Sequence, residues 1–426
     1  MKAVFAVAGL WSFLILSVGF GHAQEVLTRE EALNRAVDAA FILDAQKQQI
    51  IVRGAEIKQA SLKPNPFITA DIEDFTGSGP YSGLGQSQIS LRYNQLYERG
   101  DKRRYRRSIA TQDREIARVE WRLARLNIMR QAEQAYIKIL TAQLKLDSFN
   151  DQVKIFEQTL NTLEMHQSRG QTSSLTVQNA RLQLLSARRQ VSQFQLDLEV
   201  SKQELASLWE NADVTFSIDA RELNQLPEVL SLPEINTAEN PDILFWKQQI
   251  KRSSESMSLE KAKSVQDITF NMGVRYLQGT QDVALVAGVS MPFALYDTNV
   301  NNVRKAGAAV NKSQIELMAA ERLLKRQLLL QVQKRAAAFT QVRIINAELI
   351  PEAKQTEAIA LQRLEQGIAN YLDVYAAQSV VANFSAQLIT ELQQFHLAQS
   401  EINRLTAHYD DAKAVTATIE LEIQEE

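Results

Sequence analysis

Apolar residues recur at alternating steps of three and four through a long stretch of the first half of the chain. They are Ile116, Val119, Leu123 and Leu126, followed by Phe149, Val153, Phe156, Leu160 and Leu163. This spacing is the heptad signature of helices that pack side by side. No proline interrupts the chain between Pro80 and Pro227. The pattern therefore predicts a helical hairpin over about 101–210 that reverses at Gly170.

The second half of the chain has the same organisation. A helical pattern covers about 300–408 and reverses at Gly367, and Pro351 is expected to break or kink the first helix of this hairpin. The sequence KQQI occurs at 47–50 and again at 247–250, an offset of about 200. These matches predict two structural repeats, 24–226 and 227–410. The segment 211–240 contains two prolines and is expected to be a surface linker between them.

Strict alternation of apolar and polar residues precedes each long helical stretch. It predicts strands at about 66–75 and 87–97 in the first repeat, and at about 267–277 and 282–292 in the second. About ten residues is the length that a tilted strand needs to cross a bilayer. Charged Asp71, Glu73 and Arg92 lie on the polar face, which favours a water-filled barrel in lipid over a half-buried soluble sheet. Four strands cannot close such a barrel, but three chains would supply 12 strands and leave no open edge.

The N-terminal segment has the features of an export signal. Lys2 is followed by an apolar run at 4–18, and Gly21 and Ala23 are small residues at the expected cleavage positions. We expect a signal peptide at 1–23 and an exported protein. A short N-terminal membrane anchor is the alternative, but the apolar run is too short for a comfortable span. The acidic segment 411–426 is expected to be a loosely ordered tail.

The composition gives no support to catalysis or to nucleic-acid binding. Lys and Arg number 47 against 50 Asp and Glu, so no bulk positive charge attracts nucleic acid. The chain has no cysteine, which excludes disulfides, thiolate nucleophiles and Cys zinc sites. His166, His396 and His408 are dispersed without metal-ligand spacing, and no phosphate loop or nucleophile elbow occurs. We expect a protein that is not an enzyme, with no cofactor, no catalytic residue and no metal site.

A basic run at 102–107 has two open interpretations. Its five cations could meet anionic lipid head groups where the barrel joins the helices. They could equally be the solvated start of a helix, although cations at that end oppose the helix dipole. Asp101 would offset part of that cost as the N-cap residue.

Several stretches carry a resemblance to a known family. The stretch 367–376, Gly-x-x-x-Tyr-Leu-Asp-Val-x-Ala, resembles the second helical turn of the TolC-like outer membrane efflux factors. Three others, 64–66 with 73–75, 97–103 and 291–299, resemble the heavy-metal (cobalt–zinc–cadmium, CzcC-like) efflux components. That branch typically has an acidic residue, two glycines and then Lys-Arg in the second of these stretches, and here Asp101 replaces one glycine.

The resemblance implies a mainly α fold with a small β part. Family members are homotrimers in which a 12-stranded transmembrane β-barrel continues into a periplasmic α-helical tunnel. They serve as the exit duct of a tripartite efflux system in the cell outer membrane, together with a periplasmic adaptor (membrane fusion) protein and an inner-membrane RND-type pump. We expect export of heavy-metal cations. The same duct serving organic drug efflux or type I protein secretion stays open, as does a periplasmic coiled-coil adaptor, which would leave the strands unexplained.

Two groups of residues are the candidate functional positions. The far end of a helical hairpin exposes only its turn, so the turns are expected to dock the adaptor: Arg169, Gly170, Gln171, Thr172 and Ser173, and Gln366, Gly367, Ile368, Ala369 and Asn370. Asp373 would form a ring of three carboxylates at the gate of a trimer, because related ducts carry acidic residues at the matching position. The alternative is an Asp that only favours the helix dipole.

Overall fold

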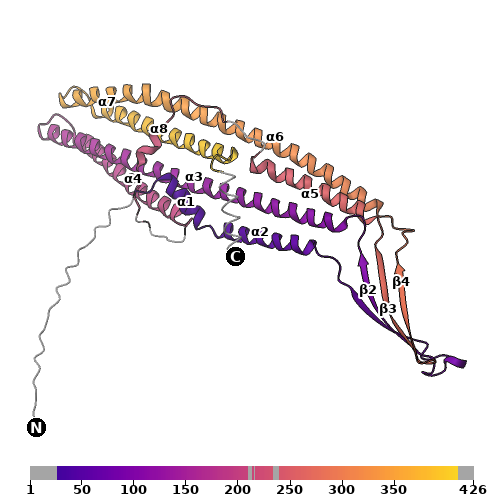
Figure 1. Cartoon of the computed structure of the whole chain (residues 1–426). Helices are drawn as coiled ribbons and strands as arrows, with labels where there is room; N and C mark the ends of the chain where they lie inside the picture. The colour runs from indigo at the N-terminus through magenta and orange to yellow at the C-terminus, as the bar shows by residue number, and fades with distance from the viewer. Residues whose placement is uncertain (1–25, 210–213, 215, 234–238, 411–426) are drawn as a thin grey trace, which may run out of the picture.

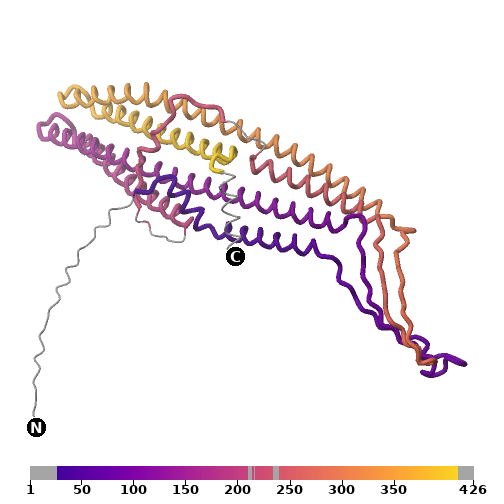
Figure 2. Tube along the Cα trace, viewed as in Figure 1, coloured from indigo at the N-terminus to yellow at the C-terminus, as the bar shows by residue number. Residues whose placement is uncertain are grey.

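The computed structural model describes residues 26–209, 214, 216–233 and 239–410. The expected signal peptide at 1–23 and the expected tail at 411–426 lie outside these residues. Long helices lie side by side along most of the molecule, and a four-stranded antiparallel sheet extends from one end (Figure 1). The Cα trace shows the two helical reversals together at the opposite end (Figure 2). This mainly helical architecture with a small sheet confirms the predicted fold class.

The elements follow each other in a similar order in both halves of the chain. The first half contains α1 (Arg29–Asp38), α2 (Phe41–Ala60), β1 (Phe67–Glu73), β2 (Gln88–Tyr97), α3 (Lys102–Ser168) and α4 (Ser174–Ala206). The second contains α5 (Pro241–Lys263), β3 (Ile268–Leu277), β4 (Asp282–Ser290), α6 (Val300–Ile344), α7 (Ile350–Glu365) and α8 (Tyr371–Leu405). The division into two repeats at 24–226 and 227–410 stays a prediction.

The long helices pack through the apolar positions that the heptad spacing marked. Near the helical reversals, Leu160 and Leu163 of α3 lie in one core cluster with Leu184 of α4 and with Leu364 and Val374 of the second hairpin. Val374 is fully buried. Burial of such side chains contributes roughly 1.5–3 kcal/mol each. Near their reversals, the two hairpins are therefore held together by side chains from both halves.

Pro351 interrupts the first helix of the second hairpin, as its chemistry requires. The α6 helix ends at Ile344, and a single π-helical turn, Ile345–Leu349, joins it to α7. Proline has no N–H to donate to the preceding turn, and its ring crowds the carbonyl four residues before it. A π turn changes the local hydrogen-bonding register and lets the chain continue in nearly the same direction.

Three parts of the helical body differ from the sequence-based expectation. Helices α1, α2 and α5 were not predicted, and α4 ends at Ala206, earlier than expected. The surface-linker prediction for 211–240 is wrong at 216–223, whereas 224–233 is mostly exposed. The short helix η2 (Ala220–Asn224) contributes the fully buried Leu223, and Phe216 is also buried in the main core cluster. The first part of the linker therefore packs against the helices as part of the core.

Polar side chains cross this core in a connected series. Arg29 of α1 lies 3.1 Å from Glu222 of η2 and 3.6 Å from the buried Glu133 of α3. Glu133 accepts a hydrogen bond from the Tyr409 hydroxyl at 3.1 Å, and Tyr409 accepts one from Asn403 of α8 at 2.9 Å. Buried polar groups are costly unless paired, so this series fixes α1, η2, α3 and α8 in one arrangement.

His396 of α8 lies beside this series and binds the same short helix. Its Nε2 donates to the carbonyl oxygen of Leu223 at 2.8 Å. Burial lowers the pKa of His396; the Leu223 carbonyl raises it, Arg29 lowers it further and Glu222 raises it. The folded protein thus holds this imidazole neutral.

We predict that His396 lowers the free energy of unfolding in acid. An unfolded chain protonates the imidazole near pH 6.5, whereas the folded chain does so only at a lower pH. The contribution of the neutral imidazole to the free energy of unfolding is complete above about pH 6.5 and is lost as the pH falls through the lowered pKa of the folded protein. His396→Gln, whose amide can still donate to Leu223, should reduce the slope of unfolding free energy between about pH 7.5 and about pH 5.5. The reduction is at most about 1.4 kcal/mol per pH unit.

Chemical denaturation at several pH values measures this slope. His408→Gln is the matched control, because His408 is an exposed histidine in the same C-terminal part of the chain. An unchanged slope in His396→Gln would show that the imidazole is not the group that titrates.

Candidate functional site

The sheet has one apolar face and one polar face, because its register aligns side chains of one kind. The order is β1-β2-β3-β4, with every neighbour antiparallel. Leu91 pairs with Ala70 on one side and with Val274 on the other, and Val274 pairs with Leu285. The exposed large side chains of the apolar face are Ile68, Ile72, Ile89, Leu91, Tyr93, Tyr97, Phe270, Met272, Val274, Val283, Leu285 and Val289. A monomeric soluble protein rarely exposes so many contiguous apolar side chains.

The polar face of the same sheet is paired by charge. Arg92 lies 3.4 Å from Asp71, and Arg275 lies 3.3 Å from Glu73. Arg275 also donates to the Ser90 hydroxyl at 3.1 Å. The three charged residues that the sequence assigned to this face thus lie there together with a fourth, Arg275.

Each helical hairpin reverses through a glycine in the left-handed region. Gly170 has φ +71° and Gly367 has φ +73°, and neither would bring an added Cβ within 4 Å of another group. The backbone conformation alone therefore favours glycine at both reversals. The Gln171 N–H donates to the His166 carbonyl, and the Ile368 N–H donates to that of Arg363, each at 2.9 Å, which closes the last turn of each helix.

The structure brings the two predicted turns together. A groove of about 830 Å³ is lined by Gln171 and Thr172 of the first turn and by the second turn from Gln366 to Asn370. Arg169 and Gly170 end α3 beside it, and Ser173 caps α4 with a side chain that accepts from the Thr176 N–H at 3.2 Å. All ten residues of the predicted docking turns therefore lie at one end of the molecule.

Asp373 has a defined local role at the start of α8. The Asn370 side chain accepts from the Asp373 N–H at 3.1 Å, and the Asp373 carboxylate accepts from the Asn370 N–H at 3.4 Å. This reciprocal pair is a capping box. Burial raises the pKa of the neighbouring Tyr371 to about 12, so its hydroxyl stays neutral. Asp373 is the acidic residue of this first turn.

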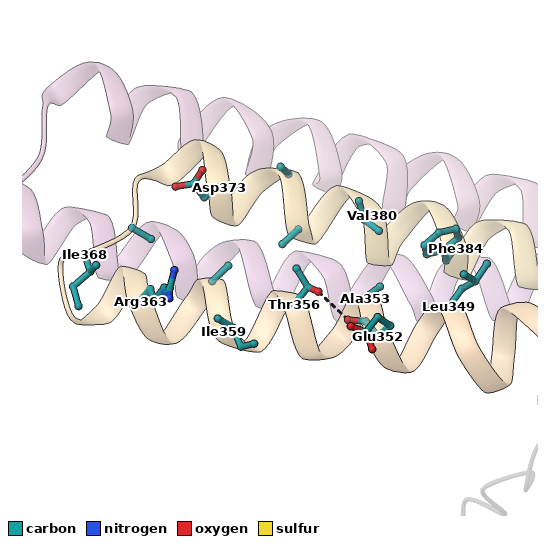
Figure 3. A pocket seen from close by; sticks show the side chains of 14 residues that line it. Leu349, Glu352, Ala353, Thr356, Ile359, Arg363, Ile368, Asp373, Val380 and Phe384 are labelled. Atoms are coloured by element: carbon teal, nitrogen blue, oxygen red, sulfur yellow. Dashed lines mark hydrogen bonds between the residues drawn. The ribbon is translucent and has the colours of Figure 1, made fainter.

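An apolar groove runs from Asp373 along α7 and α8 (Figure 3). It has a volume of about 610 Å³, and Ile359, Ile368, Val380 and Phe384 give it its apolar lining. Ile368 and Asp373 lie at the end nearest the turn, and the carboxylate is exposed there. The sequence predicted the hairpin formed by these two helices but not the groove, because apolar periodicity does not show where facing side chains leave space between helices.

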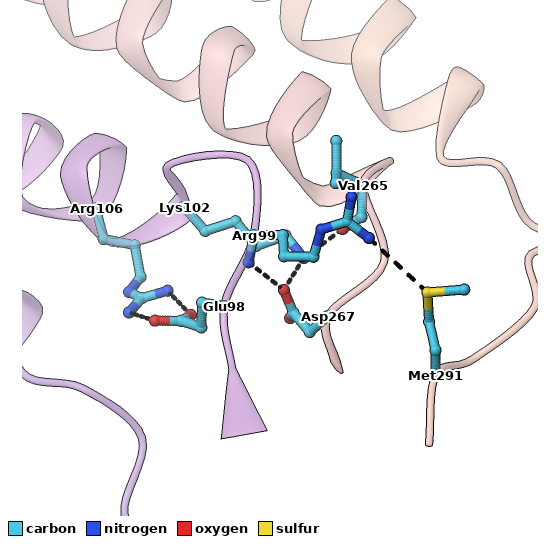
Figure 4. Close-up of polar contacts among 7 residues, drawn as sticks. All are labelled: Glu98, Arg99, Lys102, Arg106, Val265, Asp267 and Met291. Atoms are coloured by element: carbon cyan, nitrogen blue, oxygen red, sulfur yellow. Dashed lines mark hydrogen bonds and ion pairs between the residues drawn. The ribbon is translucent and has the colours of Figure 1, made fainter. Parts of the chain in front are cut away.

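The basic run at the other end of the helices is only partly solvated (Figure 4). Lys102 is buried, and its Nζ lies 2.8 Å from Asp267 and 2.7 Å from the Val265 carbonyl. Arg106 forms a two-pronged pair with Glu98. The expectation that Asp101 caps α3 with its side chain is wrong: Asp101 has φ +61°, and its carboxylate makes no capping hydrogen bond. A capping residue needs an extended backbone, which this position does not have.

Within the residues that the structure describes, no three His, Asp or Glu side chains gather closely enough to hold a metal ion. His166 is buried and lines the groove at the helical turns. Among the described helices, none is both long enough and apolar enough to cross a membrane.

Comparisons with known proteins agree with this arrangement. Residues 32–211 match the model of the family described as Outer membrane efflux protein. Together with the fold, this match identifies the chain as an outer membrane efflux channel, with its helical part in the periplasm.

A curated relative and two solved structures extend the match. The cobalt-zinc-cadmium resistance protein CzcC of Cupriavidus metallidurans is 25% identical over 383 residues, which cover 89% of this chain and 90% of that protein. The outer membrane protein VceC of Vibrio cholerae has a TM-score of 0.72 at 16% identity, over 89% of this chain and 95% of that chain. The outer membrane channel CmeC of Campylobacter jejuni has a TM-score of 0.69 at 15% identity, over 99% and 98%. The family and the fold are those of channel proteins.

Proposed function

We propose that this channel exports heavy-metal cations as the exit duct of a tripartite system, with a periplasmic adaptor and an inner-membrane RND-type pump. The observation that carries the proposal is the similarity to a cobalt-zinc-cadmium resistance protein over nearly the whole length of both chains. A duct need not bind its cargo tightly, so it needs no dedicated metal site. Organic drug efflux and type I protein secretion are the alternative cargoes.

The working form that we propose is a homotrimer. Among the described residues, the outer edges of β1 and β4 have no strand partner. In lipid each unpaired backbone group would cost several kcal/mol, so both edges need a neighbour. Because β1 and β4 run in opposite directions, β4 of one copy can pair with β1 of the next in the same antiparallel sense. Three copies would then close a barrel of 12 strands.

Loss of the protein should make its host sensitive to divalent metals. Deletion of the gene should reduce growth in cobalt, zinc and cadmium at concentrations that the parent strain tolerates, and re-expression should restore it. The restored protein should fractionate with the outer membrane as a trimer. Sensitivity to organic drugs alone would favour the alternative cargo, and a soluble periplasmic monomer would contradict the duct itself.

The ten turn residues are the proposed contact with the adaptor. The turns protrude together at the end opposite the sheet, and their exposed side chains are small or polar except for Ile368. Such a low-relief end suits contact with the tip of another helical hairpin. Asn370 and Ser173 also cap α8 and α4, so replacing either one would weaken a helix as well as a contact. Thr172 and Ala369 have no such capping role.

Bulky side chains at Thr172 or Ala369 should abolish metal tolerance while the trimer still assembles. Thr172→Trp and Ala369→Trp would separate the two tips sterically, since both side chains line the shared groove. Gln193→Trp is the control, because Gln193 is exposed on α4 about 30 Å from the turn. The chain has no cysteine, so a single cysteine at position 172 or 369 can report cross-linking to the adaptor. Cross-links that form only far from these turns would contradict the proposed contact.

Asp373 is the proposed charge at the gate. Its carboxylate is exposed in the first turn of α8, and a trimer would repeat it three times at one level. Residue 376 is Ala, so the ring would hold three charges instead of the six that two acidic positions would supply. A ring of carboxylates attracts cations and repels anions.

Asp373→Asn should lower the cation selectivity of single channels and weaken their block by multivalent cations. The asparagine oxygen can still accept from the Asn370 N–H, so the capping box is largely kept and the charge alone is removed. Asp147→Asn, at an exposed carboxylate in the middle of α3, is the matched control. Equal selectivity in wild-type and Asp373→Asn channels would remove Asp373 from the pore and leave it as a helix cap.

A further inference from the structure

A basic groove lies where β2 ends and α3 begins. It has a volume of about 910 Å³. Its charged lining residues are Lys63, Arg99, Lys102, Arg103, Arg104 and Arg107, against Glu98 and Asp101. Six cations thus face two carboxylates in a chain whose overall charge is close to balanced.

Ion pairing within the chain leaves the outer part of this groove positive. Asp267 neutralises the buried Lys102, and Glu98 is already paired with Arg106 (Figure 4). Arg104 lies 3.5 Å from Asp101, but both side chains are mostly exposed, so that pair contributes little. Among the described residues, Lys63, Arg103 and Arg107 have no carboxylate partner.

The arginines of this groove lie where the chain itself destabilises a positive charge. Arg103 and Arg104 lie in the first turn of α3, which contains no acidic residue. The positive end of the helix dipole repels cations at this position. Arg103, Arg104 and Arg107 also lie on one side of the helix, since residues three and four apart share a face. An external anion in the groove would relieve both the mutual repulsion and the repulsion by the dipole.

The apolar face of the sheet reaches the wall of this groove at Tyr97. Tyr97 lines the groove, and it follows Leu91 and Tyr93 at steps of two along β2, so it belongs to the same face. Its side chain is 62% exposed at the helical end of the strand. Tyrosine at the end of an apolar strand face is typical of the boundary between hydrocarbon and head groups.

The strand register places further aromatic residues near the same level. Tyr97 pairs with Ile268, and the next residue, Thr269, pairs with Ser290 at the end of β4. Phe293 and Tyr296 follow Ser290 and are 85% and 95% exposed. Aromatic side chains thus gather at the helical ends of both β2 and β4, and the cations of the groove lie just beyond them.

We infer that this groove binds the phosphate of an anionic phospholipid in the membrane leaflet that faces the helices. The inference rests on the proposed function only in that the sheet spans a membrane. Guanidinium groups of Arg103, Arg104 and Arg107 present paired N–H donors that match phosphate oxygens. A zwitterionic lipid carries its own ammonium group beside the phosphate and gains less from this field. The groove therefore selects phosphatidylglycerol over phosphatidylethanolamine and anchors the sheet at a fixed depth.

Native mass spectrometry of the purified full-length protein tests this selection. Each lipid is titrated in detergent, and bound lipid and oligomeric state are counted in the same spectrum. Phosphatidylglycerol should bind at least about tenfold more tightly than phosphatidylethanolamine. The triple variant Arg103→Gln, Arg104→Gln and Arg107→Gln should lose that preference and remain a trimer.

A matched variant separates this groove from a general effect of charge. Arg322→Gln, Lys325→Gln and Arg326→Gln remove three exposed cations from α6, about 33 Å along the helix from its start. This variant should keep the lipid preference. Equal loss in both variants would overturn the inference, and displacement of the lipid by inorganic phosphate at equal concentration would point to a free-anion site.

Two further outcomes keep the inference apart from the proposed duct. Loss of the trimer in the groove variant, with unchanged lipid preference per chain, would show that a second copy covers the groove, and the lipid site would be wrong. A conducting trimer without lipid preference would overturn the lipid site and leave the duct intact. A wild-type protein that forms no trimer and no channel would contradict the duct first.

Discussion

In the described part of the chain, the sheet has two free edges, and these are the constraint on which the rest of the molecule depends. A four-stranded sheet with one exposed apolar face is stable neither in water, where that face is unfavourable, nor alone in lipid, where its edges are unpaired. The polar face, with its Arg92–Asp71 pair, excludes the simple solution of burying both faces in one chain. Closure through other copies satisfies the edges, the apolar face and the polar face together. The long helices lie side by side and begin at one end of the sheet, so the helices of all copies can extend together from a closed ring of strands.

Much of this fold follows from local periodicity, and the failures have a common physical origin. The heptad spacing of α3 and the two-residue alternation of β3 are strong because one face of each is apolar. Helix α2 escaped prediction because Phe41 and Ile42 are exposed while Leu43 and Ile50 are buried, so apolar residues occur on both of its sides. The segment containing Leu223 was predicted to be a surface linker because of its prolines. Prolines indicate that the backbone is irregular, whereas burial of a side chain depends on which distant helices pack beside it.

The candidate positions divide in the same way. Gly170 and Gly367 could be predicted from sequence because a reversal between two long helices needs a left-handed residue, and glycine is rare in this chain. The basic run could be located but not resolved into paired and unpaired cations. Asp267, which neutralises Lys102, is 165 residues away and enters only when β2 and β3 pair. Local sequence cannot predict such a partner. The proposed lipid-binding groove is formed by the cations that this pairing leaves without a carboxylate.

Asp373 shows how one side chain can meet a structural and an electrostatic requirement together. A short reversal leaves the first N–H groups of α8 unpaired, and a carboxylate at the third helical position satisfies the capping residue in return. The same requirement holds the carboxylate at the very end of the hairpin, exposed beside apolar groove walls. A lysine or leucine at this position would lose the carboxylate's half of the capping box, so an acceptor side chain here stabilises the helix whatever passes through the channel. Selectivity for cations, if the carboxylate faces the lumen, would then follow from a helix cap that the reversal already demands.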